Sequence, residues 1–188
     1  SEVVSPEFKL TENNVVLFKP EYDENGLPVA ASLIEIFNRV SNLAKEGKIV
    51  AISTPTYGGI AESVMKMCFG NMVGFKFDDA VTLNDIFGYS YGSFVAEVIG
   101  ELPEGATLLG KTTAAKAISF NGEAVCLKDL LATYEGKLEK VYPAYTKTDI
   151  TTYEAFAYTA ENRKAPSVLS AKPKVIIPVF PGTNCDYD

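Results

Sequence analysis

The sequence predicts an α+β domain, a mixed sheet flanked by helices, followed by the start of a second domain. Three observations favour this fold: two long stretches with helical periodicity, several short apolar runs of strand length, and one hairpin turn. The chain has 188 residues, of which 47% are hydrophobic. That is enough for one core and a short additional segment.

The first half of the chain alternates predicted strands with amphipathic helices. Residues 15–19 and 49–53 are short apolar runs typical of strands. A helix lies between them, with Pro28 in its first turn and Gly47 at its C′ position. Its apolar face consists of Val29, Leu33, Phe37, Val40 and Ala44. A second helix ends at Gly70 and is predicted by Ile60, Val64, Met67 and Cys68.

The second half is richer in strands. Asn121-Gly122 is a favoured two-residue hairpin turn. The predicted strands cover residues 73–77, 94–99, 108–113, 115–120 and 124–127. A last helix is expected from Leu127 to Val141, with Pro143 as its terminator.

Composition divides the chain into three parts. Residues 1–143 contain the periodic elements and form the first domain. Residues 144–172 are rich in Thr, Tyr, Ala and Ser without an apolar face, which predicts a linker. Residues 173–188 contain a predicted strand, Lys174 to Phe180, followed by a tight turn. A buried strand needs neighbours, so this last part is expected to be the truncated start of another domain.

Charge and cysteine usage exclude several classes of protein. The net charge is −7, and lysines and arginines form no cluster, so a nucleic-acid partner is not expected. No apolar run approaches the roughly 18 residues of a membrane span, and no signal peptide is expected. Three cysteines without CxxC spacing favour neither disulfides nor zinc, which suits a reducing cytoplasm.

Histidine is absent, so no Ser–His or Cys–His nucleophile pair forms within this chain. Cys185 follows a predicted strand in a turn of small residues, a setting that resembles a nucleophile's. Without a histidine to ionise it, an ordinary thiol is favoured, and a thiol hydrolase stays an alternative. Cys68 and Cys126 lie in apolar patterns and are predicted to belong to the core.

The Gly58-Gly59 turn is the best candidate for chemistry. A strand, a small-residue turn and a helix N-terminus together present backbone N–H groups to an anion such as phosphate. Thr54 and Thr56 offer additional hydroxyl groups. The spacing matches neither of the common phosphate-loop patterns. A plain strand–helix turn that requires a positive φ is therefore the alternative.

Several stretches resemble one enzyme family. Residues 52–63, Ile-Ser-Thr-Pro-Thr-Tyr-Gly-Gly-Ile-Ala-Glu-Ser, resemble the region written HDxSDGGL in phosphoribosylformylglycinamidine synthases. Residues 87–98 and 109–112 are similar to two later segments of that family, in the same order. Residues 174–188 include Phe-Pro-Gly-Thr-Asn-Cys and resemble the opening of its glutamine amidotransferase domain.

This resemblance implies a fold, a reaction and partners. The first domain would be the second C-terminal subdomain, of the aminoimidazole ribonucleotide synthase type, in the large fused enzyme. That enzyme converts formylglycinamide ribonucleotide, glutamine and ATP into formylglycinamidine ribonucleotide, glutamate, ADP and phosphate, with magnesium balancing the phosphate charge. Its other synthase subdomains and its glutaminase domain would be the partners. Two copies of the isolated chain are also able to pair through exposed strand edges.

The family's site residues transfer only in part. Gly58 and Gly59 match its glycines, and Thr56 stands where it has a nucleotide-contacting serine. Thr54 replaces an aspartate that ligates magnesium, so no metal ligand is expected here. Cys185 belongs to the first-strand motif and is not the family's nucleophile. The resemblance implies an inactive subdomain without catalytic residues or tightly bound ATP; a stand-alone phosphate- or nucleotide-binding module is the alternative.

Overall fold

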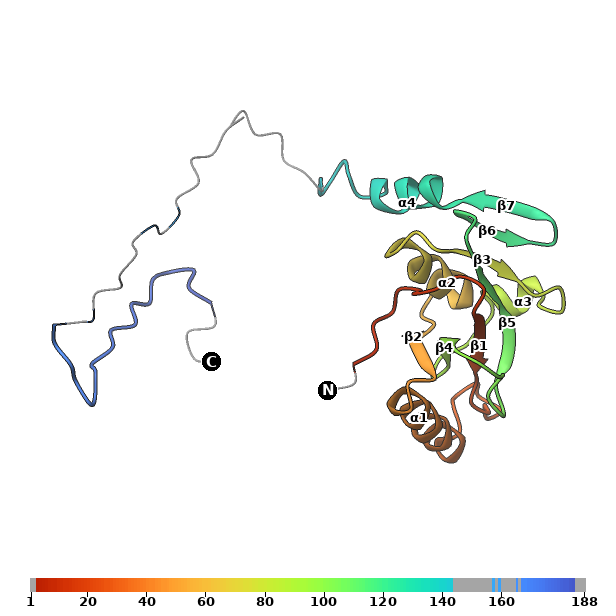
Figure 1. The fold of residues 1–188 in the computed structure, drawn as a ribbon, viewed down its shortest axis with the longest axis horizontal. Helices are drawn as coiled ribbons and strands as arrows, with labels where there is room; N and C mark the ends of the chain where they lie inside the picture. The colour runs from red at the N-terminus through yellow and green to blue at the C-terminus, as the bar shows by residue number, and fades with distance from the viewer. Residues whose placement is uncertain (1–2, 144–156, 158, 160–164, 166, 185–188) are drawn as a thin grey trace. The chain divides into compact units, whose positions relative to one another are not determined.

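The computed structural model describes residues 3–143, 157, 159, 165 and 167–184. The chain divides into two compact units, Ser1–Thr146 and Lys147–Asp188 (Figure 1). Most of the predicted linker lies outside the described residues, and so does Cys185. The functional division into two enzyme domains therefore stays a prediction.

A single seven-stranded sheet forms the centre of the first unit. Its strands run in the order β2-β4-β1-β5-β3-β6-β7. They are β1 (Asn14–Phe18), β2 (Ile49–Ser53), β3 (Gly74–Phe77), β4 (Phe94–Val98), β5 (Thr107–Thr113), β6 (Ala117–Phe120) and β7 (Glu123–Cys126). The β3–β6 pair is parallel and the other neighbouring pairs are antiparallel, so the predicted mixed sheet is confirmed.

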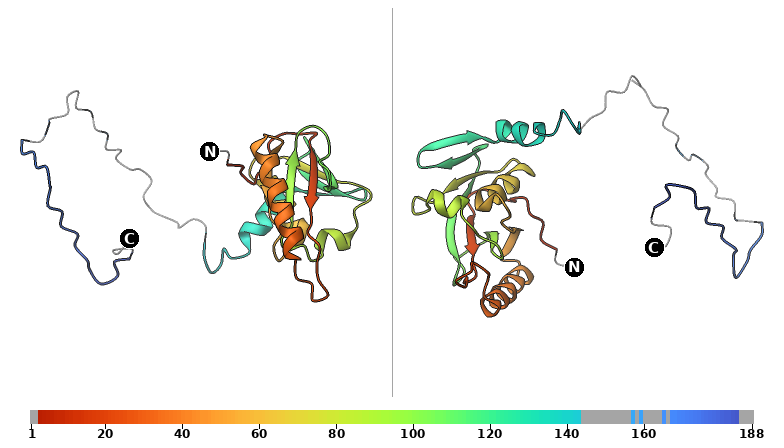
Figure 2. Two further views of the ribbon diagram at one scale, coloured as in Figure 1. Left: turned by 90° about the horizontal axis from the view of Figure 1, so that it is seen from below. Right: turned by 180° about the vertical axis from the view of Figure 1, so that it is seen from behind.

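Helices cover both faces of this sheet (Figures 1 and 2). They are α1 (Ala30–Lys45), α2 (Gly59–Phe69), α3 (Leu83–Phe87) and α4 (Leu127–Gly136). Side chains alternate between the two faces of a strand, so β1 contributes to two cores. Val16 and Phe18 pack with α1, whereas Val15 and Leu17 pack with α2. The predicted α+β class is therefore confirmed.

The buried face of α1 differs slightly from the predicted one. Ile36 and Val40 are its buried residues, four positions apart on one side of the helix. Phe37, which was expected in the core, is 47% exposed, and its ring packs edge-on against Phe94. Successive helical residues point about 100° apart, so Phe37 lies at the border of the face that Ile36 occupies. Gly47 has φ +70°, as its predicted C′ position requires.

Two helix predictions need correction. The sequence interpretation missed α3, because five residues are too few to show a period; its capping box is the local pattern that identifies it. Thr82 Oγ1 accepts a hydrogen bond from Asp85 N, and Asp85 Oδ2 accepts one from Thr82 N. The last helix ends at Gly136 rather than near Val141, which is 86% exposed and has no core to pack on.

The predicted strand over residues 174–180 does not form. These described residues have no strand assignment, and Ile176 is 89% exposed. A strand needs a hydrogen-bonded neighbour, and none of the described residues supplies one here. The tight turn that follows is present. Phe180 N donates to Thr183 Oγ1, and Thr183 N donates to Phe180 O, both at 2.9 Å.

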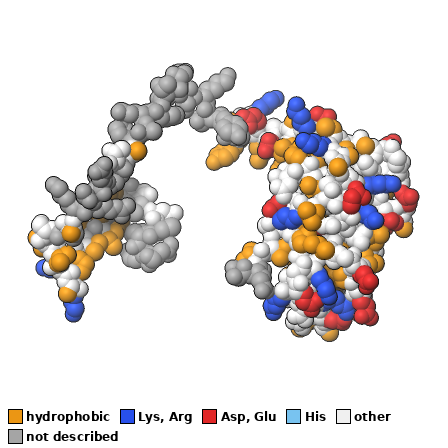
Figure 3. Space-filling view, in the orientation of Figure 1, with side chains coloured by type: hydrophobic (Ala, Val, Ile, Leu, Met, Phe, Trp, Pro, Cys, Tyr) orange, Lys and Arg blue, Asp and Glu red, His pale blue; other side chains and the backbone are white. Residues whose placement is uncertain are grey.

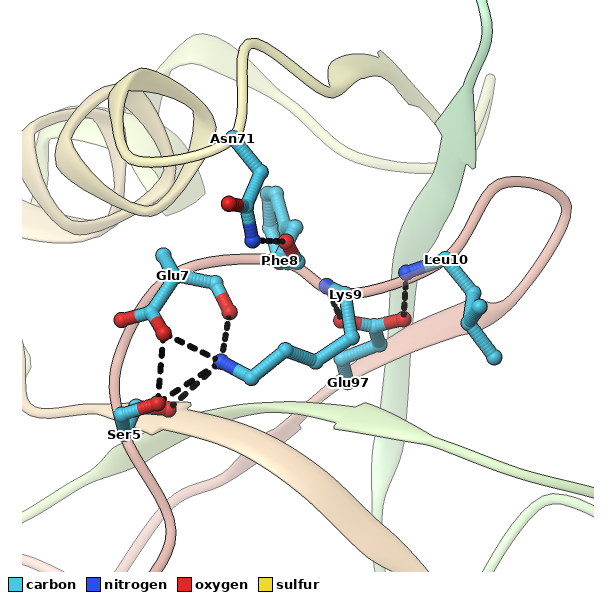
Figure 4. Close-up of polar contacts among 7 residues, drawn as sticks. All are labelled: Ser5, Glu7, Phe8, Lys9, Leu10, Asn71 and Glu97. Atoms are coloured by element: carbon cyan, nitrogen blue, oxygen red, sulfur yellow. Dashed lines mark hydrogen bonds and ion pairs between the residues drawn. The ribbon is translucent and has the colours of Figure 1, made fainter.

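The segment before β1 is anchored to the first unit by a buried carboxylate (Figure 4). Glu97 of β4 is 0% exposed. Its oxygens accept hydrogen bonds from Lys9 N at 2.7 Å and Leu10 N at 3.0 Å. The neighbouring Phe8 is also fully buried and donates its N–H to Met67 O at 2.9 Å. This segment therefore ties the end of α2 to β4 of the sheet.

Charged side chains of both signs are interspersed on the face of the first unit that Figure 3 shows. No field of one sign extends over that face. Among the described residues, no helix is long and apolar enough to cross a membrane.

Candidate functional site

The Gly58-Gly59 turn connects the end of β2 to the start of α2. Thr56 and Gly59 form an isolated bridge, in which Gly59 N donates to Thr56 O at 3.0 Å. The structure therefore brings Thr56, Gly58 and Gly59 together. Thr54 is exposed one residue after β2, and its side chain makes no hydrogen bond to a described residue.

Gly59 is required by the geometry of this turn. Its φ is +67°, a conformation that L-residues with side chains rarely adopt. A Cβ at this position would lie 2.8 Å from the carbonyl oxygen of Ile86 and 3.2 Å from that of Gly88. Gly59 thus permits α2 to begin directly against the end of α3. The alternative given by the sequence, a plain strand–helix turn, requires this positive φ.

An internal carboxylate occupies the donors of the turn. Glu62 Oε2 accepts hydrogen bonds from Gly58 N and from Thr56 Oγ1, both at 2.8 Å. Glu62 Oε1 pairs with the Lys66 ammonium one helical turn later. Hydrogen bonds from Lys66, Gly58 and Thr56, in that order, lower the pKa of Glu62 to about 2. The carboxylate is therefore ionised at neutral pH, and it lies where an external anion would otherwise bind.

Sequence reasoning did not identify Glu62 as part of the site. The available pattern was an acidic residue in the first turn of a predicted helix, a position that the helix dipole favours. The sequence alone does not show that this side chain folds back over Gly58. That depends on the conformation of the turn, which Gly59 determines.

The turn does not fit a magnesium ion. Mg²⁺ prefers charged oxygen ligands that are free to coordinate. Glu62 is the one carboxylate at the turn, and both of its oxygens already accept hydrogen bonds or pair with Lys66. No group of three or more His, Cys, Asp or Glu residues in the described part of the chain is arranged to hold a metal.

A nucleotide phosphate does not fit the turn in this conformation either. Gly58 N–H and the Thr56 hydroxyl, which the sequence offered as phosphate donors, both donate to Glu62. A phosphate would have to displace the Glu62 carboxylate and then lie beside it. Repulsion between two anions opposes that arrangement.

A serine–lysine pair lies elsewhere in the first unit, before β1 (Figure 4). Lys9 Nζ donates to Ser5 Oγ at 2.8 Å, a geometry in which a neutral lysine activates a serine. Here Lys9 is also 2.9 Å from Glu7 Oε1, and hydrogen bonds from Ser5 and Lys9 lower the pKa of Glu7 to about 2. The Ser5 hydroxyl donates to Glu7 Oε1 at 2.6 Å, so the three side chains form one closed polar cluster rather than an activated serine.

The two described cysteines differ from each other. Cys68 is buried, as predicted, and burial raises the pKa of its thiol to about 12. Cys126 is exposed, so its predicted place in the core is wrong. It belongs to β7, an edge strand whose four residues are all exposed. Cys68 therefore has neither the low pKa nor the access that a reactive thiolate needs.

Comparisons with known proteins identify the fold. No family model matches the chain, and a search of curated proteins finds no match. Among solved structures, phosphoribosylformylglycinamidine synthase II from Thermotoga maritima superimposes with a TM-score of 0.54 at 11% identity. The chain has the fold of a domain of this synthase. The match covers 81% of this chain and 30% of the synthase chain.

Two further structures of the T. maritima synthase, PurL, give the same result. Its complex with FGAR has a TM-score of 0.55 at 10% identity and covers 86% of this chain and 33% of that one. Its complex with ATP has a TM-score of 0.53 at 12% identity and covers 81% and 30%. This chain therefore spans about a third of the length of PurL.

Proposed function

We propose that the chain is a non-catalytic domain of a phosphoribosylformylglycinamidine synthase. This ligase uses ATP and glutamine to convert formylglycinamide ribonucleotide into formylglycinamidine ribonucleotide. The shared fold and the order of the sequence motifs support the assignment. The fold alone does not carry function, so the role of the domain depends on its site.

One observation supports the non-catalytic role most directly: Glu62 fills the donor position of the Gly58-Gly59 turn. The turn corresponds to the family motif that contacts nucleotide. In this chain the contact is internal, between a carboxylate and the backbone of the same turn. ATP and magnesium would then be held by other subdomains of the enzyme.

The domain's contribution is positioning. Ligation requires that ATP, the amide of formylglycinamide ribonucleotide and ammonia are held together in reactive positions. This proximity effect is worth about 7–11 kcal/mol. The close contact between α2 and the end of α3 at Gly59 fixes one surface of this domain. In the complete synthase, this surface would close over the substrates that the other subdomains bind. The partners are the other synthase subdomains and the glutaminase domain.

The activity is tested on the complete polypeptide that contains this chain. We expect formylglycinamidine ribonucleotide to form from formylglycinamide ribonucleotide, glutamine and Mg-ATP. Gly59→Val should reduce this synthesis, because the added side chain meets the carbonyl of Ile86, and should reduce glutamine hydrolysis less. Gly47→Val is the matched control, since Gly47 has a similar φ with open space around it.

Two outcomes would contradict the proposal. If the complete polypeptide forms no amidine product, the ligase assignment is wrong. If Gly59→Val leaves synthesis at the level of Gly47→Val, the turn is only a connection, and the domain does not act through it.

The isolated 188-residue chain separates the non-catalytic role from its alternative. We expect neither ATP hydrolysis nor glutamine hydrolysis above the blank. A stand-alone nucleotide-binding module would instead bind ATP without the rest of the enzyme. The occupied donors of the turn do not favour that alternative.

A further inference from the structure

The dipeptide Asn-Gly occurs twice in this chain, at Asn25-Gly26 and at Asn121-Gly122. Both copies have the same covalent chemistry. The glycine nitrogen is able to attack the asparagine side-chain carbonyl, because glycine has no side chain to obstruct the approach. Both asparagines are exposed, so water reaches each of them. A difference in reactivity between the two sites in the folded chain must therefore come from the backbone around them.

The first copy lies in a turn that is closed by its own hydrogen bonds. Gly26 N, the atom that would attack, donates to Asp23 O at 3.0 Å. The Asp23 side chain fixes the peptide groups on either side, since its Oδ1 accepts from Asn25 N and from Leu27 N, both at 2.9 Å. Gly26 is also half-buried. An acceptor thus holds the nucleophile of this site in place.

The second copy has no such protection. Asn121 and Gly122 form the two-residue turn between β6 and β7 (Figure 1). Both residues are exposed, and Gly122 N makes no hydrogen bond to a described residue. A Cβ on Gly122 would have nothing within 4 Å, so the space around this turn is open as well. Deprotonation of the Gly122 nitrogen therefore breaks no hydrogen bond.

The hairpin that carries the second copy is held to the sheet on one side only. β7 is an edge strand whose four residues are all exposed. β6 joins the rest of the sheet through its parallel pairing with β3, in which Phe75 faces Ile118 and Lys76 faces Ser119. A segment with few buried contacts opens locally at low cost. Ring closure requires the Asn121 backbone to rotate out of its turn conformation, and local opening permits that rotation.

We propose that Asn121 is a site of spontaneous deamidation, and that the turn around Asn25 protects the identical dipeptide there. The deprotonated nitrogen of Gly122 forms a bond to Cγ of Asn121. The Cγ–N bond of the side-chain amide breaks, and its nitrogen takes up a proton and leaves as ammonia. Water then opens the cyclic imide at one of its two carbonyls. The products are aspartate and isoaspartate, in which the main chain runs through Cβ. The site does not depend on the ligase role.

Both products alter the β6–β7 hairpin. Aspartate adds a negative charge two residues before Glu123, and the two like charges repel each other. Isoaspartate lengthens the main chain by one atom, in a two-residue turn whose geometry matches the twist of the flanking strands. Phe120 and Glu123 face each other across this turn, so a longer connection displaces the first pair of the ladder. We expect isoaspartate to loosen β7 more than aspartate does.

Peptide mapping by mass spectrometry tests the proposal. The folded 188-residue chain is kept at pH 8 and sampled over several weeks, and conversion is followed at both asparagines. Asn121 should convert at least about threefold faster than Asn25, a ratio that one intramolecular hydrogen bond supports. Both aspartate and isoaspartate should appear at position 121. In concentrated urea the two sites should convert at about the same rate, because the unfolded dipeptides are equally accessible.

Three results would overturn the proposal. The first is a folded chain in which Asn121 converts less than about threefold faster than Asn25. The second is the same ratio of rates in urea as in the folded chain, because the difference would then come from the neighbouring sequence. The third is aspartate as the sole product at position 121, since the cyclic route also yields isoaspartate.

One variant tests the protective turn. Asp23→Ala removes the acceptor of Asn25 N and Leu27 N but leaves the backbone carbonyl of residue 23. It should raise the rate at Asn25 toward that at Asn121, while the rate at Asn121 serves as the internal control and stays unchanged. An unchanged rate at Asn25 in this variant would contradict the protection assigned to Asp23.

A second variant tests the effect on the hairpin. Asn121→Gly is unable to deamidate at this position and keeps a dipeptide that suits the turn. Hydrogen exchange of β7 should become faster as the wild-type chain ages, and should stay constant in Asn121→Gly. If β7 changes equally in both chains, or in neither although isoaspartate has formed, deamidation does not act on the hairpin, and the inferred consequence is wrong.

Discussion

The Glu97 carboxylate and the Asn13 amide, 84 positions apart, are joined by a hydrogen bond of 2.7 Å. Glu97 is fully buried in β4, and its other hydrogen bonds come from the N–H groups of Lys9 and Leu10. Three donors from one segment thus converge on one carboxylate. This contact fixes the chain before β1 in place, and no periodicity in the sequence indicates it.

Glu97→Gln should destabilise the first unit by about 2 kcal/mol or more. The substitution replaces one accepting oxygen with a donor that faces another donor, and leaves at least one of the three donors, such as Lys9 N–H, without its acceptor. Urea denaturation measures the change. The control is Glu101→Gln, an exposed residue whose substitution should change stability by less than about 0.5 kcal/mol. Equal effects of the two substitutions would contradict this account of Glu97.

Gly59→Ala should cost more stability than Gly47→Ala, although the backbones are alike. Gly59 has φ +67° and Gly47 has φ +70°, so both substitutions share the left-handed strain of about 1–2 kcal/mol. At Gly59 the new Cβ also meets the Ile86 carbonyl at 2.8 Å, whereas Gly47 has nothing within 4 Å. We expect an additional cost of at least about 1 kcal/mol at Gly59. Chemical denaturation of both variants checks this, and equal costs would mean that α2 and α3 separate easily.

The stabilising effect of Glu62 should depend on pH in the acid range. Its pKa falls from 4.5 to about 2 in the folded chain, so the ionised form stabilises the native state. This contribution is fully present above about pH 4.5 and is lost as the pH falls toward 2. The difference in melting temperature between wild type and Glu62→Gln should therefore be largest above pH 4.5 and vanish near pH 2. A difference that is independent of pH would contradict the hydrogen bonds assigned to this carboxylate.

Cys126 should react with iodoacetamide much faster than Cys68. The thiolate is the reactive form, and burial both raises the pKa of Cys68 to about 12 and shields its sulfur. Cys126 is exposed on an edge strand. Mass spectrometry at pH 8 should find Cys126 alkylated while Cys68 stays unmodified until the chain unfolds. Equal labelling rates in the native chain would show that α2 does not bury Cys68.

The sequence was informative where structure is local and periodic. Regular spacing predicted α1 and α2, and Asn121-Gly122 predicted the β6–β7 hairpin, in which both turn residues have positive φ. The run over residues 174–180 was predicted as a strand from its composition, but a strand exists only with a partner. At the candidate site, the glycines were identified and Glu62 was not, because its role depends on where the turn directs its side chain.

The central claim is that Glu62 occupies the donors of the Gly58-Gly59 turn, so this domain does not hold a nucleotide by itself. Isothermal titration of the 188-residue chain with Mg-ATP tests it most directly. We expect a dissociation constant of about 1 mM or weaker, worth no more than about −4 kcal/mol. Micromolar, magnesium-dependent binding that Thr54→Ala abolishes would contradict the account, because it would show a working nucleotide site at this turn.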